Sequence, residues 1–233
     1  AAVKGDTIID GNRIITAGQS VGELYGVWLL RHVDQKKPDG EPFIDPTEQL
    51  NYEVASNGWV LNKASKQPYI SPDLYSLGNP NPKFMMTIIN DFSYKKMLTF
   101  SFQLDWLNGN HVYNETKQWM YRDGVHADYE KPITINSEKG AWSAFYRGVY
   151  SPSSNWTKNY FYEDASFVRL RNVSLGIDFA RIFNIDKINK LQLILSGRNL
   201  WTHTKYTGMD PEISSYAADW YEGTASSLSR GYD

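Results

Sequence analysis

The side chains of this sequence best suited to bind a ligand are five aromatic residues in one long predicted loop, between residues 108 and 165. Indole and phenol rings can stack on the apolar face of a sugar or clamp a peptide chain. The same rings can instead form the core of a loop that folds on itself and packs against another protein, and this packing interpretation is favoured. The candidate residues are Trp119, Tyr121, Trp142, Tyr146 and Trp156.

The charged and imidazole side chains give weaker signals. The four histidines occur singly and never as a ligand-spaced pair, which argues against a metal site. An acidic run from Asp39 to Glu48 could bind calcium, but it lacks the interleaved Asp, Asn and Gly pattern of a calcium loop, so a solvated loop is favoured. No Ser–His–Asp order, paired carboxylates or phosphate loop indicates catalysis, and we expect a protein that is not an enzyme and has no cofactor.

Composition excludes several classes of function. The chain has 233 residues, a formal net charge of -2 and no basic tract, so no nucleic-acid partner is expected. It contains no cysteine, which excludes disulfides, and no apolar run of about 18 residues that would form a membrane-spanning helix. Its first residues lack the pattern of a signal peptide. Aromatic residues make up 15 % of the chain, a surplus typical of sugar-binding surfaces and of membrane-interface belts.

The elements that must position the aromatic loop are strands with strict alternation. From Leu98 to Trp106 every even position is apolar up to the closing Trp, and every odd position is polar. Successive side chains of a strand point to opposite faces, so this strand has one apolar and one polar face. Residues 84–92 form a less regular strand, and a short turn at 93–96 joins the two as a hairpin.

The pattern then restarts after the aromatic loop. Positions 172–179 alternate, a turn runs through 184–187, and positions 191–196 alternate again. Residues 1–33 contain strand segments broken by glycines, whereas residues 34–83, rich in proline, and the tail from Trp201 onward are predicted loops. No helix with a 3.6-residue period is expected. Both short turns therefore fall at one end of a sheet and the long loops at the other.

This arrangement is typical of outer-membrane β-barrels, which have tight periplasmic turns and long outer loops. It also predicts aromatic rims at both ends of the apolar face. Because a soluble β-sandwich has alternating strands too, a secreted glycan-binding sandwich stays open as the alternative. The predicted long-loop rim consists of Phe84, Trp106, Phe167 and Trp201, and the predicted short-turn rim of Phe92, Tyr94, Phe179 and Phe183.

Three motifs resemble the SusC/RagA family of TonB-dependent outer-membrane transporters. The first is Gly78-Asn79-Pro80-Asn81-Pro82-Lys83-Phe84 followed by Asn90-Asp91-Phe92-Ser93-Tyr94-Lys95, Phe100, Gly109 and Asn114. The second, Asp164 to Gly176, is similar to the strand "sFlRLrNvsLgY" of that family. The third, Ser196 to Thr202 followed by Lys205 to Glu212, is similar to "sGqNLft.tkYtGlDPE". Together they cover roughly residues 78–212 in the family order.

The resemblance implies an all-β fold in which antiparallel strands form part of a large transmembrane β-barrel with long extracellular loops and short periplasmic turns. Residues 1–233 would be the C-terminal segment of that barrel, with no plug domain and without the closing strand. The loop 34–83 departs from the family by lacking an Asp-rich stretch before the Gly-Asn-Pro motif. Any calcium site there is therefore in doubt.

The resemblance also implies a function: import of oligosaccharides or peptides across the outer membrane of a Gram-negative bacterium of the Bacteroidota type. The implied partners are a SusD-like lipoprotein lid on the long loops, the rest of the same barrel and its plug, TonB acting through the absent plug, and outer-membrane lipid. In such a barrel Phe100, Phe102 and Leu104 would face lipid, and Ser101, Gln103 and Asp105 would face the lumen.

Overall fold

The computed structural model describes residues 8–10, 13–20, 23–140, 146, 149, 158–188 and 190–212. The chain divides into unit 1 (Ala1–Pro80, Val112–Glu163 and Thr207–Asp233) and unit 2 (Asn81–His111 and Asp164–Tyr206). All strand pairs of known register are antiparallel, which confirms the predicted all-β class. Within the described residues, no helix has the length and apolar character needed to span a membrane.

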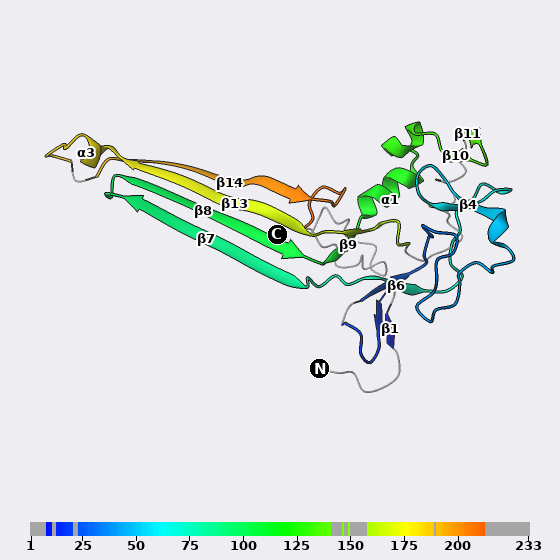
Figure 1. Ribbon diagram of the computed structural model, residues 1–233. Coiled ribbons are helices and arrows are strands. Elements are labelled where there is room, and N and C mark those ends of the chain that lie inside the picture. The colour runs from blue at the N-terminus through cyan, green and yellow to red at the C-terminus, as the bar shows by residue number, and fades with distance from the viewer. Residues whose placement is uncertain are drawn as a thin grey trace. The chain divides into compact units, whose positions relative to one another are not determined.

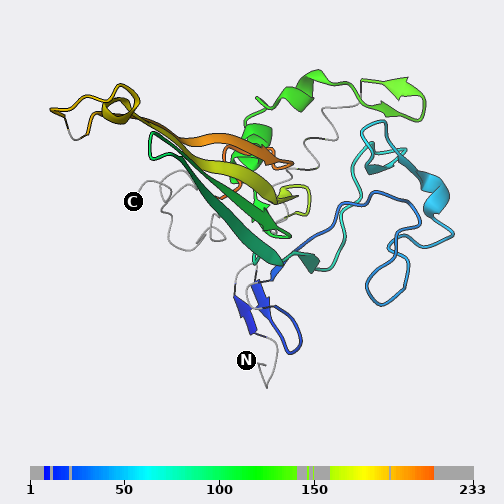
Figure 2. The same cartoon turned by 60° about the vertical axis from the view of Figure 1, so that its left-hand side comes forward.

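Unit 2 is one four-stranded antiparallel sheet. Its order is β14-β13-β8-β7, and Figures 1 and 2 show the four long strands side by side. Each strand has 11 to 13 residues, and the four coincide with the four alternating stretches of the sequence. The strands are β7 (Phe84–Tyr94), β8 (Leu98–Asn108), β13 (Phe167–Asp178) and β14 (Gln192–Thr204).

Both short connections lie at the same end of this sheet, as predicted. In the β7–β8 turn, Lys95 and Lys96 have φ angles of 47° and 57°, and the Met97 N–H donates to the Tyr94 carbonyl over 2.9 Å. Two consecutive positive φ angles are the mark of a type I′ turn, whose twist matches that of the flanking strands. The β13–β14 connection contains the short helix α3 (Phe179–Ile182).

Two predicted boundaries in unit 2 are wrong. Phe179 does not continue β13 but begins α3, because the Asp178 carboxylate accepts the Arg181 N–H and starts a helical turn. Trp201 is not in a loop, since β14 stays paired with β13 as far as Thr204 opposite Phe167. The alternation of polarity fades in this part of β14, but backbone pairing with β13 keeps it extended.

Unit 1 is built from short strands, so the prediction that residues 34–83 are all loop is only partly right. Prolines interrupt the segment, yet short strands of three or four residues form between them and pair with other strands. The sheets are β1-β2-β3-β6, β4-β5, β10-β11 and β12-β9. The strands are β1 (Ile8–Asp10), β2 (Arg13–Ile15), β3 (Leu24–Gly26), β4 (Tyr52–Val54), β5 (Val60–Asn62), β6 (Tyr75–Gly78), β9 (His111–Tyr113), β10 (Thr134–Ile135), β11 (Glu138–Lys139) and β12 (Tyr162–Asp164).

Unit 1 also contains the helix α1 (Glu115–Arg122), so the expectation of no helix is wrong. Asn114 caps it by accepting the Lys117 N–H over 3.0 Å. Because the helix has only two turns and buries only Glu115 and Tyr121, it leaves almost no 3.6-residue pattern in the sequence. The described part of unit 1 also forms the short 3-10 helices η1 (Gln49–Asn51) and η2 (Ala127–Glu130).

The core of unit 1 is rich in aromatic residues. Tyr121 and Phe161 are almost completely buried in it, together with the aliphatic residues Leu29 and Leu61. A second cluster surrounds Phe43, whose ring lies 5.6 Å from that of Trp28 and 5.0 Å from that of Tyr75. The segment 34–83 therefore contributes apolar side chains to a packed core, although its many prolines predicted a loop.

Candidate functional site

The strands of unit 2 bring residues of like polarity together. Phe92 pairs with Phe100, Phe100 with Leu175, and Leu175 with Leu195. Directly opposed residues share a face of a sheet, so one apolar face extends across all four strands. This apolar face contains Met86, Ile88, Phe92, Leu98, Phe100, Phe102, Leu104, Trp106, Leu170, Val173, Leu175, Ile177, Leu193, Leu195 and Trp201.

In the part of the chain that the structure describes, the apolar face is largely uncovered. Phe92, Phe100 and Leu195 expose 56, 41 and 57 % of their surface. The rings pack mainly along the face, with Phe100 6.1 Å from Phe92 and 6.0 Å from Phe102 between centroids. Apolar surface left in water costs about 25 cal/mol per Å². A face of this extent therefore requires an apolar environment.

The opposite, polar face carries a hydrogen-bond network centred on Asp105. Its carboxylate accepts hydrogen bonds from the Thr87 hydroxyl over 3.0 Å, from the Gln103 amide over 3.0 Å and from Nε of Arg171 over 2.8 Å. Arg171 also donates to the side-chain oxygen of Asn199 over 3.3 Å. The network joins β7, β8, β13 and β14, which gives this face the hydrogen bonds and charges of a water-facing surface.

A bulge in β13 brings Arg171 onto the polar face. Leu170 and Asn172 pair with the consecutive residues Leu104 and Gln103 of β8, so Arg171 is the extra residue of a β-bulge. In β14 the corresponding irregularity places Asn199 in the left-handed region, with a φ of 50°. The extra residue allows the side chains of Arg169 and Arg171 to reach the same face, where Arg169 donates to Thr202 over 2.9 Å.

The aromatic residue at position 167 does not belong to the predicted rim. Phe84 and Trp106 do lie at the long-loop end of the apolar face, with ring centroids 5.1 Å apart. Phe167, however, pairs with Leu107, lies on the other face and is only 3 % exposed. The reason is the bulge: before it, apolar-face residues of β13 occupy even positions, and after it they occupy odd positions.

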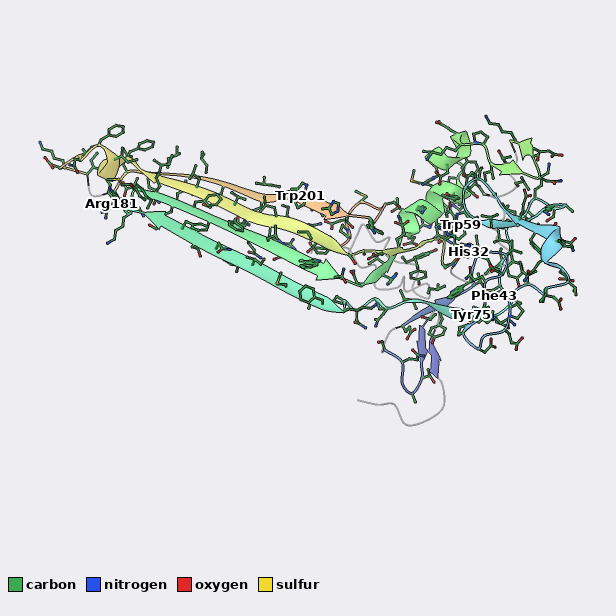
Figure 3. The ribbon with its side chains drawn as sticks, in the orientation of Figure 1. His32, Phe43, Trp59, Tyr75, Arg181 and Trp201 are labelled. Atoms are coloured by element: carbon green, nitrogen blue, oxygen red, sulfur yellow. The ribbon has the colours of Figure 1, made fainter. Side chains whose placement is uncertain are left out.

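The remaining rim residues are placed as follows. Trp201, labelled in Figure 3, lies on the apolar face of β14. Its ring stacks on that of His203. Phe92 and Tyr94 are exposed at the short-turn end of β7. Phe179 and Phe183 are also at this end, but at α3 and not on a strand, and their rings stack at 6.1 Å.

Three of the five predicted ligand-binding aromatics of the 108–165 loop are described, two of them buried and one exposed. Tyr121 and Tyr146 are buried, at 1 and 3 % exposure, with ring centroids 5.3 Å apart. This burial fits the packing interpretation of these two residues. Trp119 on α1 is exposed, and the guanidinium of Arg122 lies 5.6 Å from its ring centroid. Trp142 and Trp156 lie outside the described residues.

A chain of hydroxyl groups fixes Tyr121 within this core. Tyr121 donates to the Asp128 carboxylate over 2.5 Å, so the 2.5 Å contact with Tyr160 requires that Tyr160 donate to Tyr121. Burial is the main reason that the pKa values of both phenols lie above their usual range. Burial also raises the pKa of Tyr146 to about 12. These phenols are neutral at physiological pH and act as structural hydrogen-bonding groups.

His126 is tied to the same chain. Its Nδ1 lies 3.3 Å from the Asp128 carboxylate, but it accepts the Asp128 N–H over 3.1 Å. The accepted hydrogen bond requires an unprotonated Nδ1, so we describe His126 as neutral and not as the cation of an ion pair. Burial agrees with this assignment, because it lowers the pKa of His126 despite the opposing attraction of Asp128.

Two carboxylates of the acidic run between Asp39 and Glu48 are engaged in local hydrogen bonds. The Asp45 carboxylate accepts the N–H and the hydroxyl of Thr47 over 2.8 and 2.6 Å, and Asp39 accepts the Glu41 N–H over 3.0 Å. Within the described ranges, no group of three or more His, Cys, Asp or Glu side chains is arranged to hold a metal ion.

Sequence reasoning missed the polar network and the hydroxyl chain. The first had a visible signal, because the apolar positions of β13 change from even at Val168 and Leu170 to odd at Val173 and Leu175. Such a change of phase within one strand indicates a bulge. The second had none, since no local pattern connects Tyr121 with Asp128, and Tyr160 is 39 residues from Tyr121 and meets it only through tertiary packing.

Comparison with known proteins gives one curated relative and several solved structures. TonB-dependent receptor P3 of Formosa agariphila is 28 % identical over 215 residues, which are 87 % of this chain and 20 % of the relative. This chain is similar to a TonB-dependent receptor. It spans about a fifth of the length of that relative. The similarity confirms the resemblance that the three motifs predicted, whereas no family model matches the chain.

Solved structures of RagAB are also similar to this chain. The RagAB peptide importer in the closed-closed state is 17 % identical, with a TM-score of 0.47 over 86 % of this chain and 21 % of that one. The RagAB peptide transporter is 15 % identical, with a TM-score of 0.49 over 88 % of this chain and 22 % of that one.

Proposed function

We propose that the four strands of unit 2 are part of the wall of a transmembrane β-barrel in the outer membrane, within a larger TonB-dependent transporter. The observation that carries this proposal is the uncovered apolar face, which lies opposite a face whose hydrogen-bond network joins all four strands. In a barrel, the apolar face contacts lipid and the polar face lines the lumen. The similarity to a TonB-dependent receptor supports the same role.

The strand lengths agree with this role. A membrane strand needs about 9–11 residues when tilted by about 45°, and the strands of unit 2 have 11 to 13. Within unit 2 both β7 and β14 are edge strands, since the sheet order ends with them. An open edge is excluded from the hydrocarbon region, so the proposal requires further strands of the same barrel beside both.

In this proposal the complete protein imports oligosaccharides or peptides, driven by TonB through a plug domain, and unit 2 is a passive part of its wall. A SusD-like lipoprotein would cover the extracellular loops, and the host would be a Gram-negative bacterium of the Bacteroidota type. Among the candidate aromatics that the structure describes, Trp119 is the one proposed to contact the ligand or the lid, because its ring is exposed whereas those of Tyr121 and Tyr146 are buried. No catalytic role is assigned to any residue.

The alternative, a secreted β-sandwich that binds glycans, is weaker. A sandwich buries the apolar face of one sheet against a second sheet about 10 Å away. The described residues of unit 2 form a single sheet whose apolar face stays exposed. No described residue of unit 2 forms a second layer over this face.

Cysteine accessibility in whole cells tests the proposal. We would place single cysteines at Phe100, Phe102 and Leu104, with the neighbouring Ser101 and Gln103 as matched positions on the other face of β8. A lipid-soluble maleimide should label the first group, and a small charged thiosulfonate should label the second. Exchange of the two labelling patterns, or equal labelling of both groups by the charged reagent, would contradict the barrel wall.

A further inference from the structure

The two connections at the short-turn end of unit 2 form one continuous surface. The Asp178 N–H, at the end of β13, donates to the Met97 carbonyl in the β7–β8 turn over 2.8 Å. The Phe179 N–H in turn donates to the Leu191 carbonyl over 2.7 Å, which closes the base of the second connection. Figure 3 shows Arg181, a residue of α3, at this end of the sheet.

This surface carries an excess of positive charge. Its five basic side chains are exposed, and only two carboxylates, Asp178 and Asp186, lie in the same connections. Asp178 is buried and contacts Arg181, with 3.3 Å between its oxygen and Nε, so it does not offset the lysines. The basic residues are Lys95, Lys96, Arg181, Lys187 and Lys190.

The same surface also exposes apolar side chains, which a purely water-facing turn would not need. Phe183 is 67 % exposed, and its neighbours Ile182, Ile185, Ile188 and Leu191 are exposed as well. They are continuous in the chain with β13 and β14, whose apolar face ends here. We call these apolar residues and the five basic residues the turn-end patch.

We propose that the turn-end patch binds the headgroups of anionic phospholipids in the leaflet that borders the short turns. The inference rests on the proposed membrane position of the sheet. Aromatic and aliphatic side chains at this level insert at the acyl boundary, while long basic side chains extend to the phosphates. Basic residues next to an anionic membrane surface favour binding by electrostatic attraction, which is screened by salt.

The lysines of the β7–β8 turn make a non-disruptive test possible. Lys95 and Lys96 occupy the two left-handed positions of a type I′ turn, where Asn and Gly are preferred. The change Lys95→Asn with Lys96→Gly therefore removes two charges without weakening the turn. Lys187→Gln and Lys190→Gln complete the patch variant. A control variant removes four lysines elsewhere: Lys36, Lys37, Lys139 and Lys205, each changed to Gln.

The experiment uses the complete protein that contains this chain, reconstituted into phosphatidylcholine vesicles with spin-labelled phosphatidylglycerol or spin-labelled phosphatidylcholine as the probe. Electron paramagnetic resonance gives the relative association of the two lipids with the protein. Each lysine near an anionic membrane surface raises the binding constant for that surface about fivefold. We expect a phosphatidylglycerol preference in the wild type and the control, parity in the patch variant, and a preserved preference when the four lysines become arginine.

Three results would overturn the proposal: an unchanged preference in the patch variant, an equal loss in the control, or full displacement of the labelled lipid by millimolar inorganic phosphate, which would indicate a general anion site. Incorporation into pure phosphatidylcholine vesicles reports separately on the barrel wall. Incorporation without lipid preference refutes only the lipid site, whereas failure to incorporate refutes both proposals.

Discussion

The cost of an arginine on β8 should depend on its face and its depth. The strand has 11 residues. At about 3.3 Å per residue and a tilt of about 45°, it rises roughly 25 Å along the membrane normal, the height of the apolar band of a barrel. Phe102 and Gln103 lie at its middle, and Leu98 lies at its short-turn end. Phe102→Arg should therefore destabilise the inserted protein by about 2–4 kcal/mol, and Leu98→Arg by about 0–1 kcal/mol.

Gln103→Arg is the matched control, since it places the same charge at the same depth on the polar face, and it should be nearly neutral. Guanidinium unfolding of the complete protein from phospholipid vesicles measures all three free energies. The reasoning fails if Phe102→Arg and Gln103→Arg cost the same, or if Leu98→Arg costs as much as Phe102→Arg. Equal costs on the two faces would mean that water reaches both.

Three further predictions concern the polar network and the loop core. Asp105→Leu should destabilise the fold by about 1–3 kcal/mol by leaving Arg171 without its carboxylate, and a double-mutant cycle with Arg171→Met should recover part of that loss. Burial lowers the pKa of His126 in the folded state, so the unfolded state binds more protons. The free energy of unfolding should therefore fall as the pH drops below about 6.5, and it should become constant below the folded-state pKa. The change His126→Gln should remove this pH dependence, as measured by urea unfolding at several pH values. Trp119→Ala should leave stability within about 0.5 kcal/mol but reduce uptake of labelled ligand, whereas Tyr121→Ala should lower stability by about 3–5 kcal/mol.

The sheet of unit 2 was predictable because alternation along a strand is a local property. Each residue from Leu98 to Trp106 reports its own face, so the strands and their hairpins follow from the sequence. The β13 bulge broke this logic: a constant two-residue period carried through it assigns Phe167 to the wrong face. The sequence does show that the apolar positions of β13 change from even to odd at Arg171, but this change indicates a bulge only when the two halves of the strand are considered separately.

Unit 1 was less predictable because its order comes from tertiary contacts. Helix α1 is too short to show a period, and its cap at Asn114 becomes evident only with the N–H of Lys117 in place. The burial of Tyr121 depends on Tyr160 and Asp128, which no local pattern connects with it. The sequence of an aromatic-rich loop therefore does not distinguish the rings that are buried in a core from those that are exposed.

The extra residue at Arg171 has a consequence for the evolution of this segment. Loss of Arg171 would give an unbroken two-residue period in which Leu170 and Val173 still share the apolar face, because Leu170, Asn172 and Val173 already pair with consecutive residues of β8. The ladder would close, and the polar face would lose the guanidinium that binds Asp105. Loss of a residue between Val173 and Ile177 would instead turn part of the strand over and place aliphatic side chains on the polar face. Deletions should therefore be tolerated by the apolar face at Arg171 and strongly selected against in the rest of this half of β13.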